Sequence, residues 1–193
     1  MMRNPVLSIG LITAMVFLFC FPAAAGDPTT AVETLLKTKI DSVLDVLGQD
    51  ELTDEAKREQ VMAVINPVMN FSLMAKLTLG KANWGRLTPE ERTRFVDLFV
   101  ERLKASYLNK ITLYTDQKVI YEKATESSGK VHVPTYLEAS DGRVEIIYKF
   151  YSANDQWQVY DVEIDGVSFI KSYRSQFDEV LKSGTVDDLF AQL

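Results

Sequence analysis

The sequence predicts an α+β fold in which helices gather on one face of a curved antiparallel sheet. Two features of the chain predict this fold. Apolar residues recur at three- and four-residue steps up to about residue 116, and at two-residue steps in the β-branched and aromatic stretch that follows. Short turn sequences divide that stretch, so successive strands should pair antiparallel as a meander. A further helical pattern follows the stretch.

Residues 1–25 carry the pattern of a cleaved signal peptide. A positive charge precedes the apolar stretch Val6–Phe21, and the small residues Ala23–Ala25 follow it. An uncleaved membrane anchor is the alternative, but this stretch of about 16 residues is shorter than the roughly 20 that span a bilayer. We therefore expect cleavage after Ala25, a single mature domain of residues 26–193, and an exported product.

Four helices are predicted ahead of the sheet. The first three are expected at residues 30–47, 53–65 and 72–79. The fourth has the clearest start, because Thr88 can be its N-cap, Pro89 fits its first position and Glu91 completes a capping box. One face of this helix carries Phe95, Leu98, Phe99, Leu103, Tyr107, Ile111 and Tyr114.

Four strands are predicted, at about residues 117–124, 130–139, 143–152 and 156–164. The turns between them are Ser127–Gly129, Asp141–Gly142 and Ala153–Asp155. A helix from Phe169 up to Gly184 follows the last strand, and Thr185–Asp188 can cap a short final helix. The expected order is therefore helices, a four-stranded meander and two more helices.

The composition excludes several kinds of partner and site. A net charge of −6 and a pI near 4.9 argue against a nucleic-acid binder, which needs a basic face. The single cysteine, Cys20, and the single histidine, His132, exclude disulfide frameworks and Cys/His zinc sites. Because Cys20 lies in the signal segment and the glycines are scattered, neither a Cys–His dyad nor a phosphate-binding loop is expected. We therefore predict no catalytic residues and no metal site.

The alternating acidic run Asp161–Asp165 resembles the opening of a calcium-binding EF-hand loop. The twelfth position of such a loop needs a glutamate and is Ser172 in this chain. Strand alternation explains the run without a metal, because it places the three carboxylates on one face of a strand. The opposite face is then expected to carry Tyr160, Val162 and Ile164.

Large aromatic side chains are concentrated around the predicted sheet. Every tyrosine lies at or beyond Tyr107, and phenylalanine and tryptophan residues occur in the neighbouring helices and strands. These side chains either fill an ordinary core or border a gap where sheet and helices fail to meet, which would leave an apolar cavity for a ligand. Composition alone does not decide between the two arrangements.

Two blocks of residues carry a family resemblance. The first comprises Asn66–Phe71, Met74–Lys76, Leu79–Gly80, Trp84, Leu87–Glu90 and Phe95–Phe99. The second comprises Trp157–Val162, Ile164–Ser168 and Ser172–Phe177. In this order and spacing they resemble the signatures of the MlaC family, the periplasmic lipid carriers also called toluene-tolerance auxiliary proteins. Two positions depart from the family pattern, because Asn70 replaces an aspartate and Ser172 replaces an asparagine.

The resemblance implies a function as well as a fold. Members of this family are not enzymes, and they hold phospholipid tails in an apolar cavity of a strongly curved, helix-covered, NTF2-like sheet. They carry lipid through the periplasm between an outer-membrane lipoprotein complex and an inner-membrane ABC transporter with its substrate-binding MCE subunit. The resemblance thus implies phospholipid as cargo, no cofactor, and a monomer. Because relatives also carry hopanoid or other lipids, it leaves open the head group, the number of acyl chains and the direction of transport.

Ten residues are expected to line or border the cavity. They are large apolar side chains from the predicted helices and strands, namely Phe71, Met74, Phe95, Phe99, Tyr107, Tyr148, Phe150, Val162, Ile164 and Ile170. The strand members depend on the strand register, because a shift of one residue exchanges the two faces of a sheet.

Two other functions stay open on the sequence. One is an enzyme with a similar cone-shaped fold, in which Asp161 or His132 acts as an acid or base beside an apolar pocket. The other is an exported structural or interaction module with a filled core, which would yield no extractable ligand.

Overall fold

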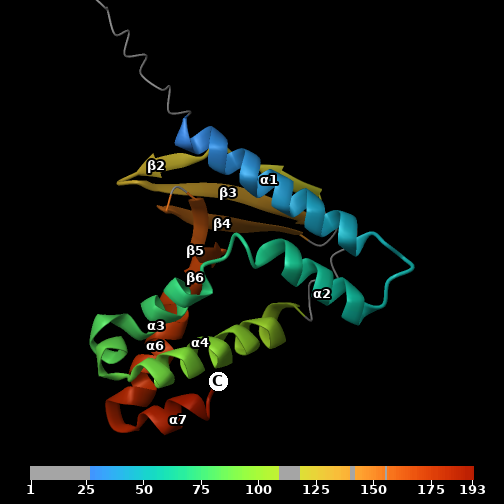
Figure 1. The fold of residues 1–193 in the computed structure, drawn as a ribbon. Helices are drawn as coiled ribbons and strands as arrows, with labels where there is room; N and C mark the ends of the chain where they lie inside the picture. The colour runs from blue at the N-terminus through green and yellow to red at the C-terminus, as the bar shows by residue number, and fades with distance from the viewer. Residues whose placement is uncertain (1–26, 109–117, 140–141, 155) are drawn as a thin grey trace, which may run out of the picture.

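The computed structural model describes residues 27–108, 118–139, 142–154 and 156–193 (Figure 1). The predicted signal peptide and its cleavage site lie outside these ranges, as do Ile111 and Tyr114. The order of elements is helices, antiparallel sheet and helices, as the sequence predicts. In Figure 1 the sheet and the first helix lie at the top, and a group of helices lies below them.

Side-chain caps start the helices where the sequence indicates. Within the described ranges the helices are α1 (Pro28–Leu47), α2 (Asp54–Ile65), α3 (Phe71–Arg86), α4 (Pro89–Leu103), the π-helical turn η1 (Lys104–Leu108), α6 (Phe169–Ser183) and α7 (Val186–Phe190). Thr53 caps α2, because its side-chain hydroxyl accepts a hydrogen bond from the backbone N–H of Ala56 in the first turn of the helix. Complete capping boxes join Thr88 to Glu91 and Thr185 to Asp188.

α3 consists of two helical segments that meet at a kink at Gly80, so the end predicted before Gly80 is the end of the first segment. Gly80 has a φ of 67° and a ψ of 168°, and the helix continues after it to Arg86. A positive φ of this size favours glycine. A Cβ at this position would also clash with the guanidinium of Arg174 on α6. Glycine therefore permits both the kink and the close approach of the Arg174 guanidinium to the backbone of α3.

The described part of the sheet has six strands, so the prediction of four is wrong. They are β1 (Lys118–Tyr121), β2 (Thr125–Ser127), β3 (Lys130–Ala139), β4 (Gly142–Ala153), β5 (Gln156–Ile164) and β6 (Val167–Ser168). All pairs are antiparallel, in the order β1-β3-β4-β5-β6, with β2 also paired to β3. β2 and β6 are too short to show the two-residue apolar period by which strands are predicted from sequence. Each is joined to its neighbour by a two-residue turn with positive φ at both positions, Ser128–Gly129 and Asp165–Gly166.

A β-bulge between β4 and β5 changes which residues share a face. The register shifts between Lys149 and Phe150, so Tyr160 has no direct partner on β4. The Tyr160 hydroxyl lies 3.3 Å from Nε2 of His132, on the same face as Asp161. The simple alternation that places Tyr160 beside Val162 and Ile164 is therefore wrong.

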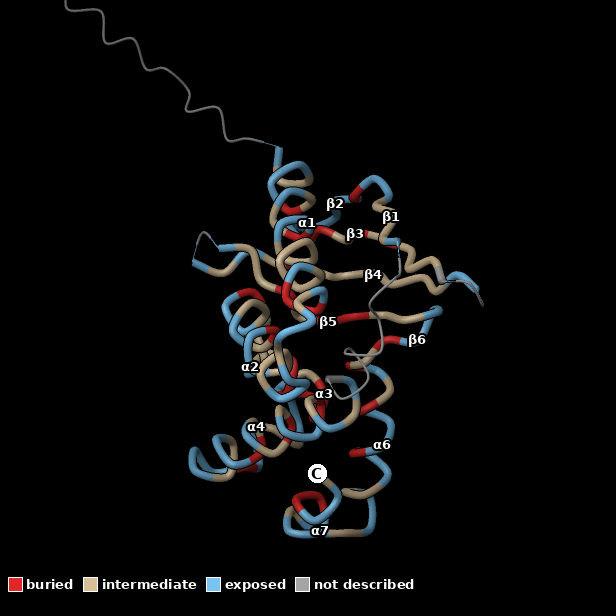
Figure 2. The backbone as a smooth tube through the Cα atoms, turned by 90° about the vertical axis from the view of Figure 1, so that its right-hand side faces the viewer, coloured by how far each residue is buried: buried red, intermediate tan, exposed pale blue. Residues whose placement is uncertain are grey.

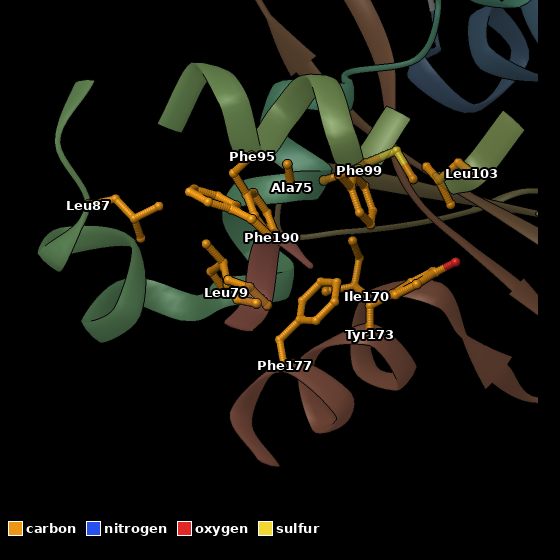
Figure 3. Close-up of a cluster of buried hydrophobic side chains, with 12 residues drawn as sticks. Ala75, Leu79, Leu87, Phe95, Phe99, Leu103, Ile170, Tyr173, Phe177 and Phe190 are labelled. Carbon is orange, nitrogen blue, oxygen red and sulfur yellow. The ribbon is translucent and has the colours of Figure 1, made fainter. Parts of the chain in front are cut away.

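Two main apolar cores lie in the described part of the chain (Figure 2). The sheet core lies between α1 and the inner face of the sheet, which we define as the face that α1 covers. It contains Val32, Leu36, Val68, Ala124, Val131, Val133, Phe150, Val159 and Val162. The helical core lies among α3, α4, α6 and α7 (Figure 3). Met69 and Phe169 pack against both cores, so the cores meet at these two residues.

Candidate lipid-binding cavity

An apolar cavity lies where the helical core and the sheet core meet. Its volume is about 140 Å³. The residues that line it come from α2, the α2–α3 connection, the start of α3, α4, η1 and α6. They are Met62, Ile65, Met69, Phe71, Met74, Val100, Leu103, Lys104, Tyr107 and Phe169. Apart from Lys104, these side chains are apolar or aromatic, so the walls suit a hydrocarbon ligand.

Hydrogen bonds to β5 position one wall of the cavity. The backbone N–H of Asn70 donates to the carbonyl of Val159 at 2.9 Å, next to a short parallel bridge between Met69 and Val159. Asn70 also caps α3, and its Nδ2 donates to Oε1 of Gln158 at 2.7 Å and to the hydroxyl of Tyr151. The first turn of α3, which carries part of the wall, is therefore anchored to the sheet.

Another part of the wall forms where α4 continues into η1. Lys104 and Tyr107 lie on this π-helical turn and both line the cavity. The Tyr107 ring stacks on Phe169, with centroids 4.5 Å apart and an interplanar angle of 27°. Tyr107 is 41% exposed, and partial burial raises the pKa of its hydroxyl. Turns of this kind are rare and are frequent at functional sites. Here the turn brings an aromatic and a cationic side chain to the exposed edge of the cavity.

Three of the ten predicted residues line this cavity directly: Phe71, Met74 and Tyr107. Met74 is fully buried and belongs to the helical core, whereas Phe71 is half-buried and packs against that core. The cavity wall thus includes part of the helical core itself.

Phe95, Phe99 and Ile170 lie in the helical core and do not line the cavity. Phe95 and Phe99 are fully buried, and their rings stack with centroids 6.1 Å apart. Figure 3 shows them pointing toward Tyr173 and Phe177 of α6, whose rings meet theirs edge to face. These side chains fill the space behind the wall that Met74 presents to the cavity.

The four predicted strand residues share the inner face of the sheet. Phe150 and Val162 are buried in the sheet core, and Tyr148 and Ile164 pack against it from half-buried positions. The pairing of Tyr148 with Val162 places their side chains next to each other. Burial raises the pKa of the Tyr148 hydroxyl to about 12. The structure therefore gathers these four residues on one face, within or against the sheet core, and none of them lines the cavity.

The sequence did not identify the remaining seven lining residues as part of the site: Met62, Ile65, Met69, Val100, Leu103, Lys104 and Phe169. Most of them are apolar residues with helical spacing, which also fits an ordinary core. Phe169 could have been identified from the sequence, because it directly follows the Ser168 helix cap and is therefore an aromatic residue at the junction between a strand and a helix. Nothing in the sequence pointed to Lys104 as a cavity residue, because a lysine at the end of a helix is usual on electrostatic grounds alone.

Asp161 serves as a structural anchor on the outer face. Its carboxylate accepts hydrogen bonds from Oγ of Ser168 at 2.7 Å and from the backbone N–H of Ile170 at 3.1 Å. Lys149 lies 3.1 Å from Asp161 and 2.6 Å from Glu163. Burial opposes the charge of Lys149, but hydrogen bonds to Glu163 and Asp161 raise its pKa above the usual value. These contacts fix the start of α6 against β5.

His132 also lies on the outer face of the sheet. Its pKa is lowered, first by burial and then by the positive charges of Lys149 and Lys130. Neither His132 nor Asp161 is among the residues that line the apolar cavity. The two groups that the sequence suggests as an acid or base therefore do not line the apolar site.

In the described ranges, no three histidine, cysteine or acidic side chains lie close enough together to hold a metal ion. The acidic run of β5 is instead occupied by contacts with Lys149, Ser168 and the start of α6. None of the helices described by the structure is both long and apolar enough to cross a membrane.

Comparison with known proteins finds two relatives that align with most of this chain. The toluene tolerance protein ttg2D of Pseudomonas putida is 22% identical over 173 residues, which cover 87% of this chain and 80% of the relative. The intermembrane phospholipid transport system binding protein MlaC of Haemophilus influenzae is 21% identical over 178 residues, which cover 86% of this chain and 83% of the relative.

A solved structure shares the fold. It is the phospholipid-binding protein of Ralstonia solanacearum in complex with a phospholipid, and it superposes with a TM-score of 0.74. The identity is 24%, and the match covers 82% of this chain and 92% of the other. The family profile described as MlaC protein matches residues 37–193. Because this match spans well over half of the sequence, the chain belongs to the MlaC family.

Proposed function

We propose that this protein is a periplasmic phospholipid carrier. In this proposal the mature chain is a monomeric single domain of residues 26–193, exported by a signal peptide that is cleaved after Ala25. It holds acyl chains of one lipid and moves between an outer-membrane lipoprotein complex and an inner-membrane ABC transporter with its MCE subunit. The observation that carries the proposal is the apolar cavity between the two cores. The phospholipid-binding and transport descriptions of the relatives support it.

The size of the cavity indicates how the carrier loads. A volume of about 140 Å³ is close to that of an apolar cavity that admits benzene, and lies below the roughly 300–1,000 Å³ of most ligand sites. It therefore accommodates the end of one acyl chain and not a whole lipid. Loading requires the helical core to move away from the sheet core. We place this opening at Met69 and Phe169, where the two cores touch.

The ten residues predicted from the sequence take different parts in this proposal. Phe71, Met74 and Tyr107 contact the chain that enters first. As the cores separate, acyl chains extend along the inner face of the sheet, where Tyr148, Phe150, Val162 and Ile164 lie. Phe95, Phe99 and Ile170 support the helical wall from behind.

The energetics explain why a carrier is needed and why it works without a nucleotide site. Each CH₂ group transferred out of water is worth about 0.8 kcal/mol, so some 30 methylenes of a two-chain lipid represent on the order of 20 kcal/mol. An apolar cavity provides surroundings similar to the membrane interior, so transfer between the two is nearly balanced. Direction then comes from the partners, and the acidic chain, with a net charge of −6, is repelled by anionic lipid surfaces.

Mass spectrometry of the exported protein tests the proposal. The chain is expressed with its own N-terminal segment in a bacterial host, recovered from the periplasm without detergent, and measured under native and denaturing conditions. The expected result is a denatured mass that begins at Gly26 and a native excess mass equal to one phospholipid, which the organic extract identifies. An empty protein that also takes no labelled lipid from vesicles would exclude the carrier function.

A matched pair of variants assigns the binding to the cavity. Val100 is half-buried and lines the cavity, whereas Val167 on β6 is exposed and does not. We expect Val100→Asp to abolish lipid uptake, because a carboxylate in the wall disfavours hydrocarbon, and Val167→Asp to leave uptake unchanged. Circular dichroism of both variants distinguishes loss of binding from loss of folding. Equal uptake by both variants would place the lipid elsewhere.

A further inference from the structure

Lys104 is the only charged residue among the described residues that line the apolar cavity. Its side chain is 36% exposed, and its Nζ lies 2.8 Å from Oε1 of Glu101, whose side chain is 68% exposed. The methylene stem of Lys104 therefore follows the apolar wall while the ammonium group reaches water at the edge. One cation thus stands where the cavity opens to solvent.

The position of Lys104 on η1 defines one side of this opening. Lys104 follows directly on α4, and Tyr107, three residues later, is the other lining residue that is substantially exposed. Stacking on Phe169 holds Tyr107 in place. Lys104 and Tyr107 together form the rim of the cavity. A molecule that inserts a hydrocarbon chain past this rim places whatever group follows the chain next to the ammonium.

The present partner of Lys104 is easily replaced. Glu101 and Lys104 form an exposed pair three residues apart on one helix, and such pairs contribute little to stability. A phosphate oxygen forms a charge-assisted hydrogen bond with an ammonium that is at least as good. Because the chain as a whole is acidic, an anionic group has little reason to approach this surface unless a local cation receives it.

We propose that Lys104 binds the phosphate of the phospholipid at the rim of the cavity, and that loading exchanges the Glu101 carboxylate for this phosphate. The inference rests on the proposed carrier function and refines it. The cargo is an amphiphile with an anionic phosphate next to its acyl chains, and uncharged lipids with the same chains are selected against. One charge-assisted hydrogen bond at a partly exposed site corresponds to about a tenfold preference.

A competition between two lipids that differ in the phosphate tests this selection. Vesicles of a neutral lipid carry equal amounts of dioleoyl phosphatidylglycerol and dioleoylglycerol in phosphate-free buffer, and native mass spectrometry measures the ratio of the two bound lipids. We expect Lys104→Gln to lower this ratio about tenfold with dioleoylglycerol uptake unchanged. Lys104→Arg should retain the ratio, and Glu101→Gln should raise it because the competing carboxylate is removed.

Lys171→Gln is the control, because it makes the same change of charge at an exposed position outside the cavity. It should bind the two lipids in the wild-type ratio. A Lys104→Gln ratio equal to wild type would overturn the inference and leave the carrier function standing. Loss of both lipids in that variant would overturn it as well, because Lys104 would then be structural. Absence of any uptake by the wild-type protein would instead exclude the carrier function itself.

A final measurement, in which inorganic phosphate competes with the two lipids, distinguishes binding of the lipid phosphate from binding of free phosphate. Inorganic phosphate added at millimolar concentration should leave the ratio unchanged, because it lacks the acyl chains that hold the lipid at the rim. Complete loss of the preference at that concentration would assign Lys104 to free phosphate and overturn the assignment to the lipid.

Discussion

Replacing Asn70 by alanine removes three hydrogen bonds that join α3 to its cap and to the sheet. Oδ1 accepts from the backbone N–H of Leu73 at 2.9 Å, and Nδ2 donates to Gln158 and Tyr151. Loss of an N-cap costs about 1 kcal/mol, and loss of each partly buried hydrogen bond costs about 1 kcal/mol. We therefore expect Asn70→Ala to lower the free energy of unfolding by about 3 kcal/mol, which lowers Tm by roughly 6–12 °C for a domain of this size.

The aspartate variant is the matched comparison for this prediction. A carboxylate at position 70 retains the cap, and the Tyr151 hydroxyl and a rotated Gln158 amide can both donate to it. Its negative charge also suits the N-terminus of α3. We expect Asn70→Asp to stay within about 1 kcal/mol of the wild type. Guanidinium chloride unfolding, followed by circular dichroism, measures both variants. A cost of less than about 1 kcal/mol for Asn70→Ala, or equal costs for the two variants, would refute the reasoning.

Three further predictions concern the glycine kink, the outer-face ion pairs and two half-buried tyrosines, Tyr121 and Tyr148. Gly80→Ala should destabilise by about 2 kcal/mol, because φ is positive and Arg174 occupies the space, whereas Gly85→Ala, with open space around it, should be neutral or slightly stabilising in thermal melts. Asp161→Asn should destabilise by about 2 kcal/mol in denaturant titrations, because Lys149 keeps only Glu163 as a partner, and no effect would show that the pair is dispensable. Burial raises the pKa of Tyr121 and Tyr148 to about 12, against about 10 in an unfolded chain. The two hydroxyls therefore lose their protons first in the unfolded state, so their contribution to stability is fully present below about pH 10 and is lost between about pH 10 and 12. Tyr148→Phe should reduce this fall in guanidinium midpoints, and an identical pH profile would contradict it.

Helix starts and strand positions could be predicted because their causes are local. Thr88, Pro89 and Glu91 form a capping box within four residues, and the structure contains it as expected. Period-two patterns located β3, β4 and β5 within one residue of their ends. Strands of two or three residues carry no such pattern, which is why β2 and β6 were missed. The bulge at Lys149 was missed as well, because it depends on how two strands fit together.

The candidate site could be predicted only in part. Phe71, Met74 and Tyr107 lie in the wall of the cavity, so their role in lipid binding stays a prediction with a location in the structure. Phe95 and Phe99 have the same spacing and the same chemistry, but their rings are enclosed by those of α6. Whether a large apolar residue fills a core or faces a gap depends on its neighbours from other elements, and these are far away in the sequence.

The sequence by itself determined the α+β class, most helix boundaries and the resemblance to the MlaC family, because caps, periodicity and motifs are encoded in neighbouring residues. Only the tertiary structure decided where the helical core and the sheet core fail to close, and that Lys104 stands at the edge of that gap. The physical reason is that a cavity is a mismatch between packed surfaces. The surfaces here belong to α2, α3, α4, η1 and α6, and only folding brings them together.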